Sequence, residues 1–469
     1  MRTRTFFHIA LAAAAVLIFL SAAAASALEL ETGGIRGFDD NRLTVTCEAG
    51  GKLTVEAASG TVPLENPVTG LEIPAGTTEI PWAGLTYGGE PLTPGSLTLR
   101  ATLERQDGQT EQAEIRVRVG NPRSAVTACL PGARTFYANG RDTLRIECAL
   151  SAPGRCEVSI ARKDRPEEEI WHTRKEANGK APLVIFWNGI GRDHKVCAPG
   201  DYVISAYTTG RSGFVQTAEV TLPEEPLPEP EMTVTGSLIP EDLADDAAVW
   251  AALTAPVAVG DGPEGKGLYI MDGRDRNSRR IGNTVCRTVG IAILEIYPDG
   301  WVKVGAWRQS DGLYTEGYML RKQLRMVRPN TRYGAVLDKK AQTLTVYGDG
   351  KKLGTVRVST GMIDGDDRKA DTHSGVFLFG TRLSNFENHG HTYCYPVRLE
   401  SLNLIHQAGY AMHDGERDFE EEIAALGTMS SHGCIRVDPR TTEENAGINS
   451  WWIWTHLGHD TKIIITPEE

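Results

Sequence analysis

The chain has 469 residues, which at roughly 100 to 200 residues per domain predicts several domains and excludes a single compact core. Hydrophobic residues make up 41% and charged residues 23%, and these ordinary globular values exclude a wholly disordered chain and a polytopic membrane protein. Because 61 acidic residues outnumber 49 lysines and arginines, the net charge is -12. This excludes a nucleic-acid-binding protein, whose affinity comes from neutralising phosphates with basic side chains.

Residues 1–27 have the three parts of a secretory signal peptide. A short basic start precedes an apolar run from Phe6 to Leu20, and small residues follow as far as Ala25-Ser26-Ala27. We expect cleavage after Ala27, and an uncleaved single-span anchor is the alternative. In either case the rest of the chain is expected to be secreted or associated with the cell envelope, outside the cytoplasm.

The residues that follow predict two β-sandwiches. Apolar and polar residues alternate in runs such as RLTVTC and AEIRVRV, with Gly and Pro between the runs. Residues 28–120 and 121–222 each have the length of one sandwich. The segment from Trp187-Asn188-Gly189 to Pro199-Gly200-Asp201-Tyr202 resembles the closing strands of immunoglobulin-like (Ig-like) modules in bacterial surface and flagellar-hook assembly proteins.

A proline- and glutamate-rich linker at residues 223–232 follows, in which residues 223–231 read PEEPLPEPE. We expect an extended spacer that separates a stalk-like half of the chain from a working half. Residues 250–328 then resemble a bacterial SH3-like barrel, on the tryptophan strand Gly300 to Val304 and the pair Gly317-Tyr318. The resemblance implies cell-wall binding or the spacing of a catalytic domain. A β-hairpin with a packed tryptophan is the alternative.

Residues 332–467 contain the motif that points to chemistry. The run Ser431-His432-Gly433-Cys434 predicts a cysteine on a tight turn, where the glycine lets backbone N–H groups approach a reacting carbonyl. A thiol with an ordinary pKa of roughly 8.5 is mostly protonated at neutral pH and needs a base. His413, ahead of Asp414-Gly415, is the candidate for that base.

The spacing from His413 to this run resembles the signature of the L,D-transpeptidase (YkuD-type) catalytic domain. Three further segments match the family: Ser359-Thr360-Gly361, Thr372-His373-Ser374-Gly375 in place of the usual Thr-Pro-x-Gly, and Tyr395-Pro396-Val397-Arg398-Leu399. The resemblance implies a C-terminal β-sandwich with short helices. The whole chain is therefore expected to be mainly β and multidomain, with two Ig-like sandwiches and an SH3-like barrel before this domain.

By this resemblance, Cys434 is the nucleophile and His413 the general base, and the chemistry requires no metal or organic cofactor. The turn residues shape the site, a tyrosine hydroxyl assists the oxyanion, and an arginine holds the turn or a substrate carboxylate. The oxyanion- and substrate-binding residues implied are Ser431, His432, Gly433, Arg436, Tyr393 and Tyr395.

The implied reaction joins two peptidoglycan stem peptides. Cys434 attacks the third residue of a donor stem, expels the terminal D-alanine and holds a thioester, which the amine of an acceptor stem resolves as a 3→3 cross-link. Resolution by water would make the same site an L,D-carboxypeptidase. Acylation of Cys434 by a carbapenem-type β-lactam is implied as well. A non-catalytic cell-wall-binding or adhesion protein is the alternative from another functional class.

Three other clusters are alternatives to a purely catalytic interpretation. The acidic run Glu416 to Glu422 indicates a solvated helix face or a lid that attracts a cationic amine. Four aspartates crowd one loop without the glutamate of a calcium site, which favours a surface loop: Asp364, Asp366, Asp367 and Asp371. A set of nitrogen and sulfur groups suits zinc: His389, His391, Cys394, His432 and Cys434.

Overall fold

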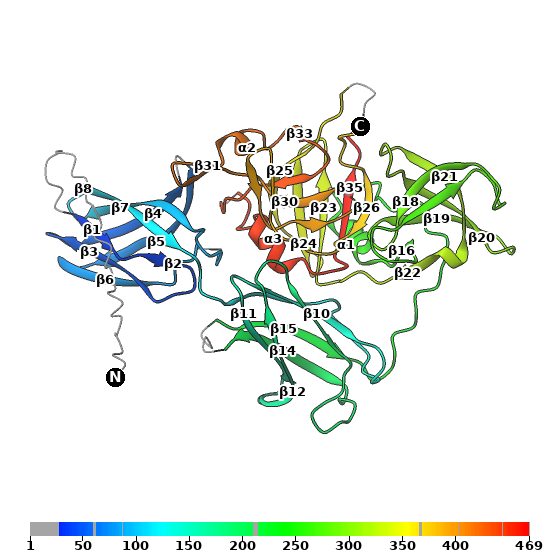
Figure 1. The fold of residues 1–469 in the computed structure, drawn as a ribbon, viewed down its shortest axis with the longest axis horizontal. Helices are drawn as coiled ribbons and strands as arrows, with labels where there is room; N and C mark the ends of the chain where they lie inside the picture. The colour runs from blue at the N-terminus through cyan, green and yellow to red at the C-terminus, as the bar shows by residue number, and fades with distance from the viewer. Residues whose placement is uncertain are drawn as a thin grey trace, which may run out of the picture.

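The computed structural model describes residues 28–468 apart from 60–61, 87, 210–213, 365–367, 402 and 443. The predicted signal peptide, residues 1–27, lies outside the described residues. The chain is mainly β, with several sheets and few short helices, which confirms the predicted fold class (Figure 1). Within the described part of the chain, no helix is long and apolar enough to cross a membrane.

The first sandwich packs a three-stranded sheet against a five-stranded one. Its strands are β1 (Glu29–Thr32), β2 (Ile35–Arg36), β3 (Asn41–Cys47), β4 (Gly51–Ser59), β5 (Val62–Ile73), β6 (Gly76–Trp82), β7 (Gly95–Arg105) and β8 (Thr110–Gly120). The sheet orders are β1-β3-β6 and β2-β8-β7-β4-β5. Alternation along the strands buries Leu43 and Val45 of one sheet against Leu53 and Leu99 of the other.

The second sandwich is built around Trp187. Its strands are β9 (Val126–Pro131), β10 (Leu144–Leu150), β11 (Gly154–Arg162), β12 (Arg165–Ala177), β13 (Leu183–Trp187), β14 (Gly200–Thr208) and β15 (Gln216–Leu222). They form two sheets, β13-β10-β9 and β12-β11-β14-β15. The Trp187 ring is fully buried between them, and the hydroxyl of the adjacent Tyr202 donates to the Ala198 carbonyl oxygen at 2.6 Å.

A seven-stranded sheet follows the linker. Its elements are β16 (Val257–Gly260), β17 (Gly267–Met271), β18 (Arg280–Val285), β19 (Gly290–Ile296), β20 (Trp301–Trp307), β21 (Tyr314–Leu320), η1 (Arg321–Gln323) and β22 (Leu324–Val327), in the order β18-β17-β21-β20-β19-β16-β22. The preceding helix α1 (Asp246–Thr254) is capped by Asp245 and buries Val249 and Leu253 against Val336 and Ile464 of the C-terminal domain.

The C-terminal domain has one large mixed sheet, two small hairpins and two helices. Its strands are β23 (Tyr333–Asp338), β24 (Thr343–Gly348), β25 (Lys351–Gly361), β26 (Gly375–Leu378), β27 (Phe386–Asn388), β28 (His391–Tyr393), β29 (Val397–Arg398), β30 (Leu404–Gln407), β31 (Ala411–His413), β32 (Glu416–Asp418), β33 (Met429–Ser431), β34 (Ile435–Val437) and β35 (Lys462–Thr466). The helices are α2 (Glu420–Ala424) and α3 (Ser450–His456).

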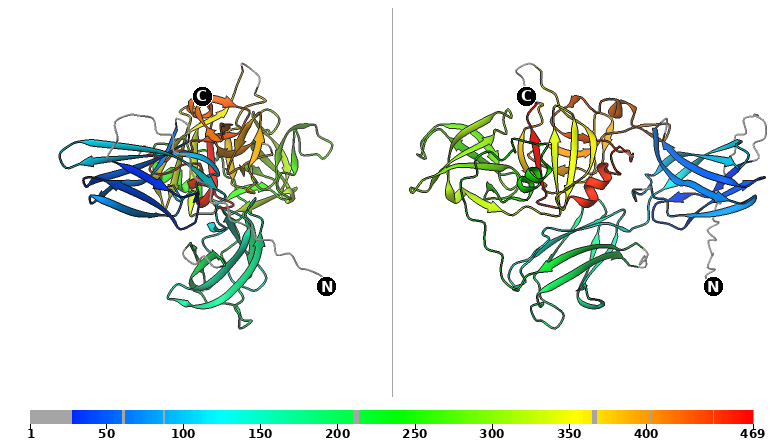
Figure 2. Two further views of the ribbon diagram at one scale, coloured as in Figure 1. Left: turned by 60° about the vertical axis from the view of Figure 1, so that its left-hand side comes forward. Right: turned by 180° about the vertical axis from the view of Figure 1, so that it is seen from behind.

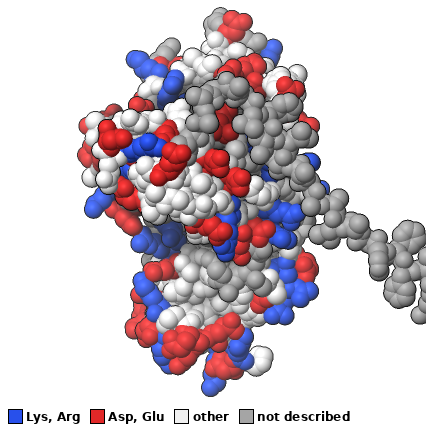
Figure 3. All heavy atoms as spheres, turned by 90° about the vertical axis from the view of Figure 1, so that its left-hand side faces the viewer, with Lys and Arg blue, Asp and Glu red and all other residues white. Residues whose placement is uncertain are grey.

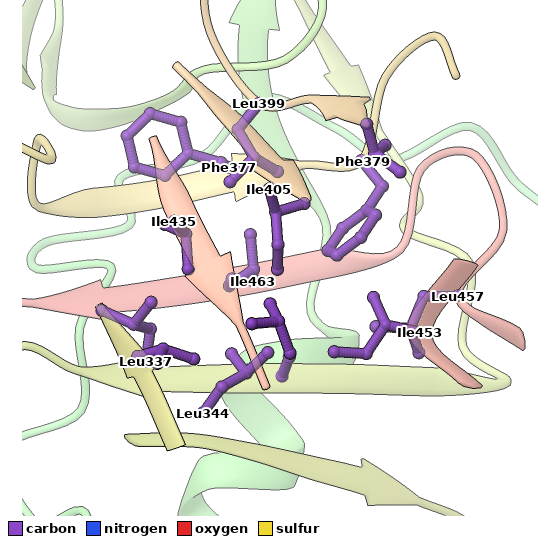
Figure 4. Close-up of a cluster of buried hydrophobic side chains, with 14 of the residues drawn as sticks. Leu337, Leu344, Phe377, Phe379, Leu399, Ile405, Ile435, Ile453, Leu457 and Ile463 are labelled. Atoms are coloured by element: carbon purple, nitrogen blue, oxygen red, sulfur yellow. The ribbon is translucent and has the colours of Figure 1, made fainter. Parts of the chain in front are cut away.

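The large sheet runs β26-β35-β23-β24-β25-β34-β30-β29, with β33 paired beside β25. β24 and β25 meet at Asp349 and Gly350, whose positive φ values suit the two-residue hairpin turn predicted there. The sheet buries a dense cluster of side chains, including Leu337, Ile405, Ile435 and Ile463, as Figure 4 shows. β35 comes after every other described strand along the chain, but it is an inner strand of the sheet.

The C-terminal domain lies at the centre of the molecule, and the other three units surround it (Figures 1 and 2). The Arg382 side chain forms a buried ion pair with Glu147 of the second sandwich, at 2.5 Å. The Ser96 N–H of the first sandwich donates to the Gly415 carbonyl oxygen at 2.9 Å. Both sandwiches therefore contact the working half directly, whereas the linker composition led us to expect a separate stalk.

Candidate active site

Cys434 lies in a tight turn between β33 and β34, within the predicted Ser-His-Gly-Cys motif. Gly433 has a φ of 109°, in the region that glycine adopts without strain. A Cβ on Gly433 would lie 2.6 Å from Asn403 Oδ1, so the turn has no room for a side chain there. Ser431 closes the turn, because its Oγ donates to the Cys434 carbonyl oxygen at 2.5 Å and accepts from the Gly433 N–H at 3.2 Å.

Strand register directs Cys434 away from the core. β30 and β34 are parallel neighbours, with Ile405 opposite Ile435 and His406 opposite Arg436. Ile405 and Ile435 point into the core (Figure 4). Because side chains alternate along a strand, Cys434, His406 and Arg436 belong to the other face of the sheet.

The ring of His406 is oriented by its neighbours on that face. Its Nδ1 lies 2.7 Å from the Gln407 carbonyl oxygen, which fixes Nδ1 as the protonated nitrogen and leaves the lone pair on Nε2. The rings of Tyr393 and Phe386 pack edge-on against the imidazole, at centroid distances of 4.9 and 5.5 Å. His406 is thus a buried imidazole with a defined tautomer.

Burial sets the charge states of the thiol and the imidazole. It raises the pKa of Cys434, although a hydrogen bond from the Leu404 backbone and the charge of Arg436 act in the opposite direction. It lowers the pKa of His406 to about 4, against the effect of the Gln407 carbonyl. At neutral pH the site therefore holds a neutral thiol and a neutral imidazole, and the imidazole is able to accept a proton.

A polar network lies within electrostatic reach of the thiol. The buried Glu422 of α2 accepts a hydrogen bond from the Tyr393 hydroxyl at 3.2 Å, and its other oxygen lies 3.2 Å from an Arg436 nitrogen. The Arg436 guanidinium also lies over the Tyr393 ring, 5.8 Å from its centroid. Burial and the charge of Glu422 raise the pKa of Tyr393 to about 12, so the phenol keeps its proton.

Two loops that the sequence singled out support the cysteine turn. Thr372 Oγ1 accepts from the Gly361 N–H at 2.8 Å and donates to the Gly433 carbonyl oxygen at 2.9 Å. The adjacent His373 is buried with its Nδ1 2.7 Å from a Glu400 oxygen. These contacts join the Ser-Thr-Gly and Thr-His-Ser-Gly segments to the turn that carries the thiol.

The C-terminal domain has a counterpart among known domain families. The family model described as YkuD, the L,D-transpeptidase catalytic domain, matches residues 332–465. By this match, the C-terminal domain is of the YkuD type. The match covers less than a third of the chain and none of residues 28–331, so the Ig-like and SH3-like modules stay predictions. No curated protein matches the chain.

Solved L,D-transpeptidase structures resemble parts of the chain at low identity. One from Mycobacterium smegmatis is 15% identical and covers 46% of this chain and 92% of that chain, with a TM-score of 0.24. One from Mycobacterium tuberculosis H37Rv is 15% identical and covers 48% and 86%, with a TM-score of 0.23. Another, solved in complex with imipenem, is 15% identical and covers 46% and 92%, with a TM-score of 0.24. At these TM-scores the likenesses carry no weight for the function of this chain.

Within the YkuD domain, the predicted base His413 occupies an exposed hairpin. It ends β31, just before the Asp414-Gly415 turn, and 71% of its side chain is exposed. Its Nε2 lies 3.6 Å from an Asp418 oxygen on β32. The structure therefore gives His413 a surface position, whereas His406 lies on the strand beside the cysteine turn.

The other predicted residues divide between the site and its surroundings. Tyr393 and Arg436 join the network around the thiol, and His432 is exposed in the turn. Tyr395 is directed elsewhere, because its hydroxyl donates to Glu90 of the first sandwich at 2.5 Å. The Gly433 N–H, expected to face an oxyanion, is engaged by Ser431 Oγ.

The alternative clusters find little support in the geometry of the YkuD domain. In the part of the chain that the structure describes, no group of three or more His, Cys, Asp or Glu residues is arranged to hold a metal ion. Asp371 is buried and lies 2.7 Å from Lys339 Nζ, while Asp366 and Asp367 lie outside the described residues. In the acidic run, Glu421 is exposed on α2, whereas Glu422 turns inward to the site.

Two residues that the structure places near the cysteine turn, His406 and Glu422, were not singled out from the sequence. A signal for His406 exists, because it follows Leu404 and Ile405 in a short apolar run typical of a buried strand. His413, by contrast, precedes Asp414-Gly415, a pair typical of an exposed hairpin turn. Glu422 had no local signal, since it is one of three consecutive glutamates, Glu420 to Glu422.

Proposed function

We propose that this protein is a cysteine-dependent L,D-transpeptidase that acts on peptidoglycan stem peptides through Cys434. The observation that carries the proposal is the strand register of β30 and β34, which pairs His406 with Arg436 and so places His406 on the face to which Cys434 belongs, inside a domain that matches the L,D-transpeptidase family. Because the substrate lies outside the cytoplasm, the proposal includes an extracytoplasmic location, which residues 1–27 support.

The reaction proposed has two acyl-transfer steps. The Cys434 sulfur attacks the carbonyl carbon of the third residue of a donor tetrapeptide, and His406 Nε2 takes the thiol proton. The bond to the terminal D-alanine breaks, and its amine leaves with the proton from His406. The side-chain amine of an acceptor stem then attacks the thioester, which forms the 3→3 cross-link and returns the proton to Cys434.

The general base proposed here is His406, although the sequence pattern favoured His413. The tautomer set by the Gln407 carbonyl supports His406, since it leaves a lone pair on Nε2. With a pKa of about 4 the ring is unprotonated at neutral pH, and it is a weaker base than an ordinary histidine. Arg436 supplies a positive charge beside the thiol, suited to the substrate carboxylate.

Intact mass spectrometry of the full chain with a tetrapeptide stem or a carbapenem tests the proposal. We expect a covalent adduct on the wild type and none on Cys434→Ala. A matched pair of variants tests which histidine is the base. His406→Gln should slow acylation about 100-fold or more, as expected for loss of a general base. His413→Gln should acylate like the wild type.

The contrary outcomes are distinct. Folded wild-type protein that forms no adduct would contradict the enzyme and favour a non-catalytic wall-binding protein. Slow acylation by His413→Gln, with His406→Gln unaffected, would identify His413 as the general base. Product analysis then distinguishes the two activities of one site, because a dimeric peptide indicates cross-linking and a released tripeptide indicates an L,D-carboxypeptidase.

A further inference from the structure

The first sandwich holds the hairpin formed by β31 and β32, which protrudes from the YkuD domain toward it in both views (Figures 1 and 2). The Ser96 N–H donates to the Gly415 carbonyl oxygen at 2.9 Å. Arg116 donates to the Asp414 carbonyl oxygen at 3.0 Å and lies 3.1 Å from a Glu416 oxygen. A Cβ on Gly95 would lie 2.8 Å from the Gly415 oxygen, so the two backbones meet without an intervening side chain.

A second contact brings the sandwich next to the proposed base. Glu90 and Leu92 line a small cavity together with Gln407 and Arg417 of the YkuD domain. Gln407 is the residue whose carbonyl oxygen fixes the tautomer of His406. The sandwich therefore packs against the backbone that orients the imidazole.

The two contacts converge on the network around the thiol. Tyr395, whose hydroxyl donates to Glu90, packs in an apolar cluster with Tyr410, Phe419 and Ile423. Phe419 caps α2 and Ile423 lies on it, so the cluster includes the start of this helix. Arg417 of β32 lies over the Tyr410 and Phe419 rings, at 5.0 and 5.7 Å from their centroids.

One residue before Ile423 on the same helix, Glu422 binds the Tyr393 hydroxyl and lies 3.2 Å from Arg436. The hairpin, the apolar cluster and α2 thus form one continuous path from the sandwich to the residues beside Cys434.

The outer end of the first sandwich offers no comparable feature. Among the residues drawn in colour in Figure 3, acidic and basic side chains are interspersed over the face turned to the viewer. Such a mixed surface gives no electrostatic preference for a strongly charged partner. This sandwich makes specific contacts with the second sandwich, such as the Phe38–Phe214 ring contact at 5.2 Å, and with the YkuD domain.

We propose that the first sandwich positions the active-site segment of the YkuD domain, residues 407–436, with Arg116 and Glu90 as positioning residues. The proposal rests on the function proposed above and adds a role for the N-terminal half of the chain. The sandwich holds the β31–β32 hairpin and Tyr395, and through α2 it keeps Tyr393 and Arg436 beside Cys434.

The test measures carbapenem acylation of the full chain for wild type and Arg116→Ala, separating the maximal acylation rate constant from the half-saturating concentration. We expect the rate constant to fall about three- to tenfold for Arg116→Ala. The charge swap Arg116→Glu with Glu416→Arg should recover part of this loss. The matched control is Arg100→Ala, which breaks an exposed Arg–Glu pair at 2.8 Å between β7 and β8 that does not involve the hairpin.

Hydrogen exchange distinguishes a positioning role from a general loss of stability, because a positioning role changes the exchange rate in one segment only. Arg116→Ala should speed exchange in residues 411–426 and leave the melting temperature and the second sandwich unchanged. Wild-type acylation rates in Arg116→Ala, with or without faster exchange, would overturn the inference. A wild type that does not acylate would instead contradict the proposed function, so the two failures are distinguishable.

A second variant covers the case in which Arg116→Ala does not fold. Glu90→Leu removes the acceptor for the Tyr395 hydroxyl from the other contact, and Tyr395→Phe removes the donor. Each should slow acylation, and the double variant should be no slower than the slower single one. Wild-type rates in both single variants would contradict the positioning role.

Discussion

Cys434 and His406 are both uncharged at neutral pH, and burial is the cause for both. The buried thiol resists ionisation, and the buried imidazole resists protonation. In the proposed mechanism, the thiolate forms as the proton moves to His406 during attack, rather than standing as an ion pair in the resting protein. A resting thiol of this kind reacts slowly with general electrophiles and needs a bound acyl donor.

The lowered pKa of His406 predicts an unusual acid limit for acylation. Neutral imidazole accepts the proton, so kcat/KM should fall only as pH drops through about 4, and not near the ordinary histidine value of roughly 6.5. Acylation rates measured across the acid range check this, with His413→Gln as the control that keeps the same profile. A half-maximal rate near the ordinary histidine value would contradict the prediction.

The same group links stability to pH. The folded-state pKa of about 4 lies below the unfolded value of roughly 6.5, so the folded protein binds fewer protons between these values. The contribution of His406 to the free energy of unfolding is therefore complete above the unfolded value and is lost as pH falls through this window.

The sequence predicts His413 as the base, and the proposal of His406 in its place rests on knowing which strands pair. Both histidines precede Cys434 at spacings that a loop can accommodate, and the signature alone favoured His413. The parallel pairing of β30 with β34 is a long-range contact, which local patterns do not encode. Cys434 itself was identifiable because its turn chemistry is local.

Among the elements, the cysteine turn depends most on one residue, Gly433. Its φ of 109° is accessible to glycine, and the position of its missing Cβ is occupied by Asn403. The turn also presents the Gly433 carbonyl oxygen to Thr372. Backbone conformation and neighbouring side chains thus fix the direction of the Cys434 sulfur together.

Gly433→Ala should therefore slow acylation about tenfold or more, because strain of about 1 to 3 kcal/mol is relieved by shifting the turn. Gly300→Ala is the matched control, since Gly300 has a φ of 85° with open space around it. The control should lose some stability and keep its acylation rate. Equal acylation rates in the two variants would show that the Gly433 conformation does not direct the thiol.

Individual strands and turns were more predictable from the sequence than the long-range contacts that they make. The β24–β25 hairpin followed from Asp349-Gly350, which supplies the pair of positive φ values that the turn requires. The acidic run was predicted as a solvated face or a lid, yet it forms β32 and α2, and Glu422 is buried. Its burial depends on Tyr393 and Arg436, which are distant in sequence, so composition alone could not reveal it.

At the scale of the molecule, two interdomain ion pairs differ in burial. Arg382 and Glu147 are 1% and 3% exposed, and Arg382 also donates to the Trp454 carbonyl oxygen near the end of α3. Arg134 and Asp349 join the same two units at 2.5 Å but are 52% and 71% exposed. Water screens the exposed pair and weakens its attraction. The two buried groups have lost their hydration, so each depends on its protein partners.

Arg382→Ala should lower the free energy of unfolding by up to about 3 to 5 kcal/mol, because it leaves the buried Glu147 carboxylate with only Arg145, at 2.6 Å, as a cationic partner. Arg134→Ala should cost less than about 1 kcal/mol. Denaturant unfolding monitored by tryptophan fluorescence compares the two. Equal losses would mean that the buried pair does not hold the second sandwich to the YkuD domain.

Neither interface was predictable from composition. The Pro/Glu linker indicated two separate halves, and this holds along the sequence but not in space, because the chain returns to place its C-terminal domain between the earlier ones. The interface residues, such as Glu90, Arg116 and Glu147, are ordinary charged residues of β-strands and loops. Only the tertiary structure distinguishes them from solvated side chains.

The position of β35 has a consequence for how the protein folds during its synthesis. This strand follows every other described strand along the chain, yet it lies between β26 and β23 and pairs with both. A ribosome completes both sandwiches and the seven-stranded sheet before it reaches this strand, and those units are free to fold first. The sheet that supports Cys434 closes only after residues 462–466 emerge. If the chain has the proposed activity, each new molecule is expected to acquire it only after this strand has been synthesised.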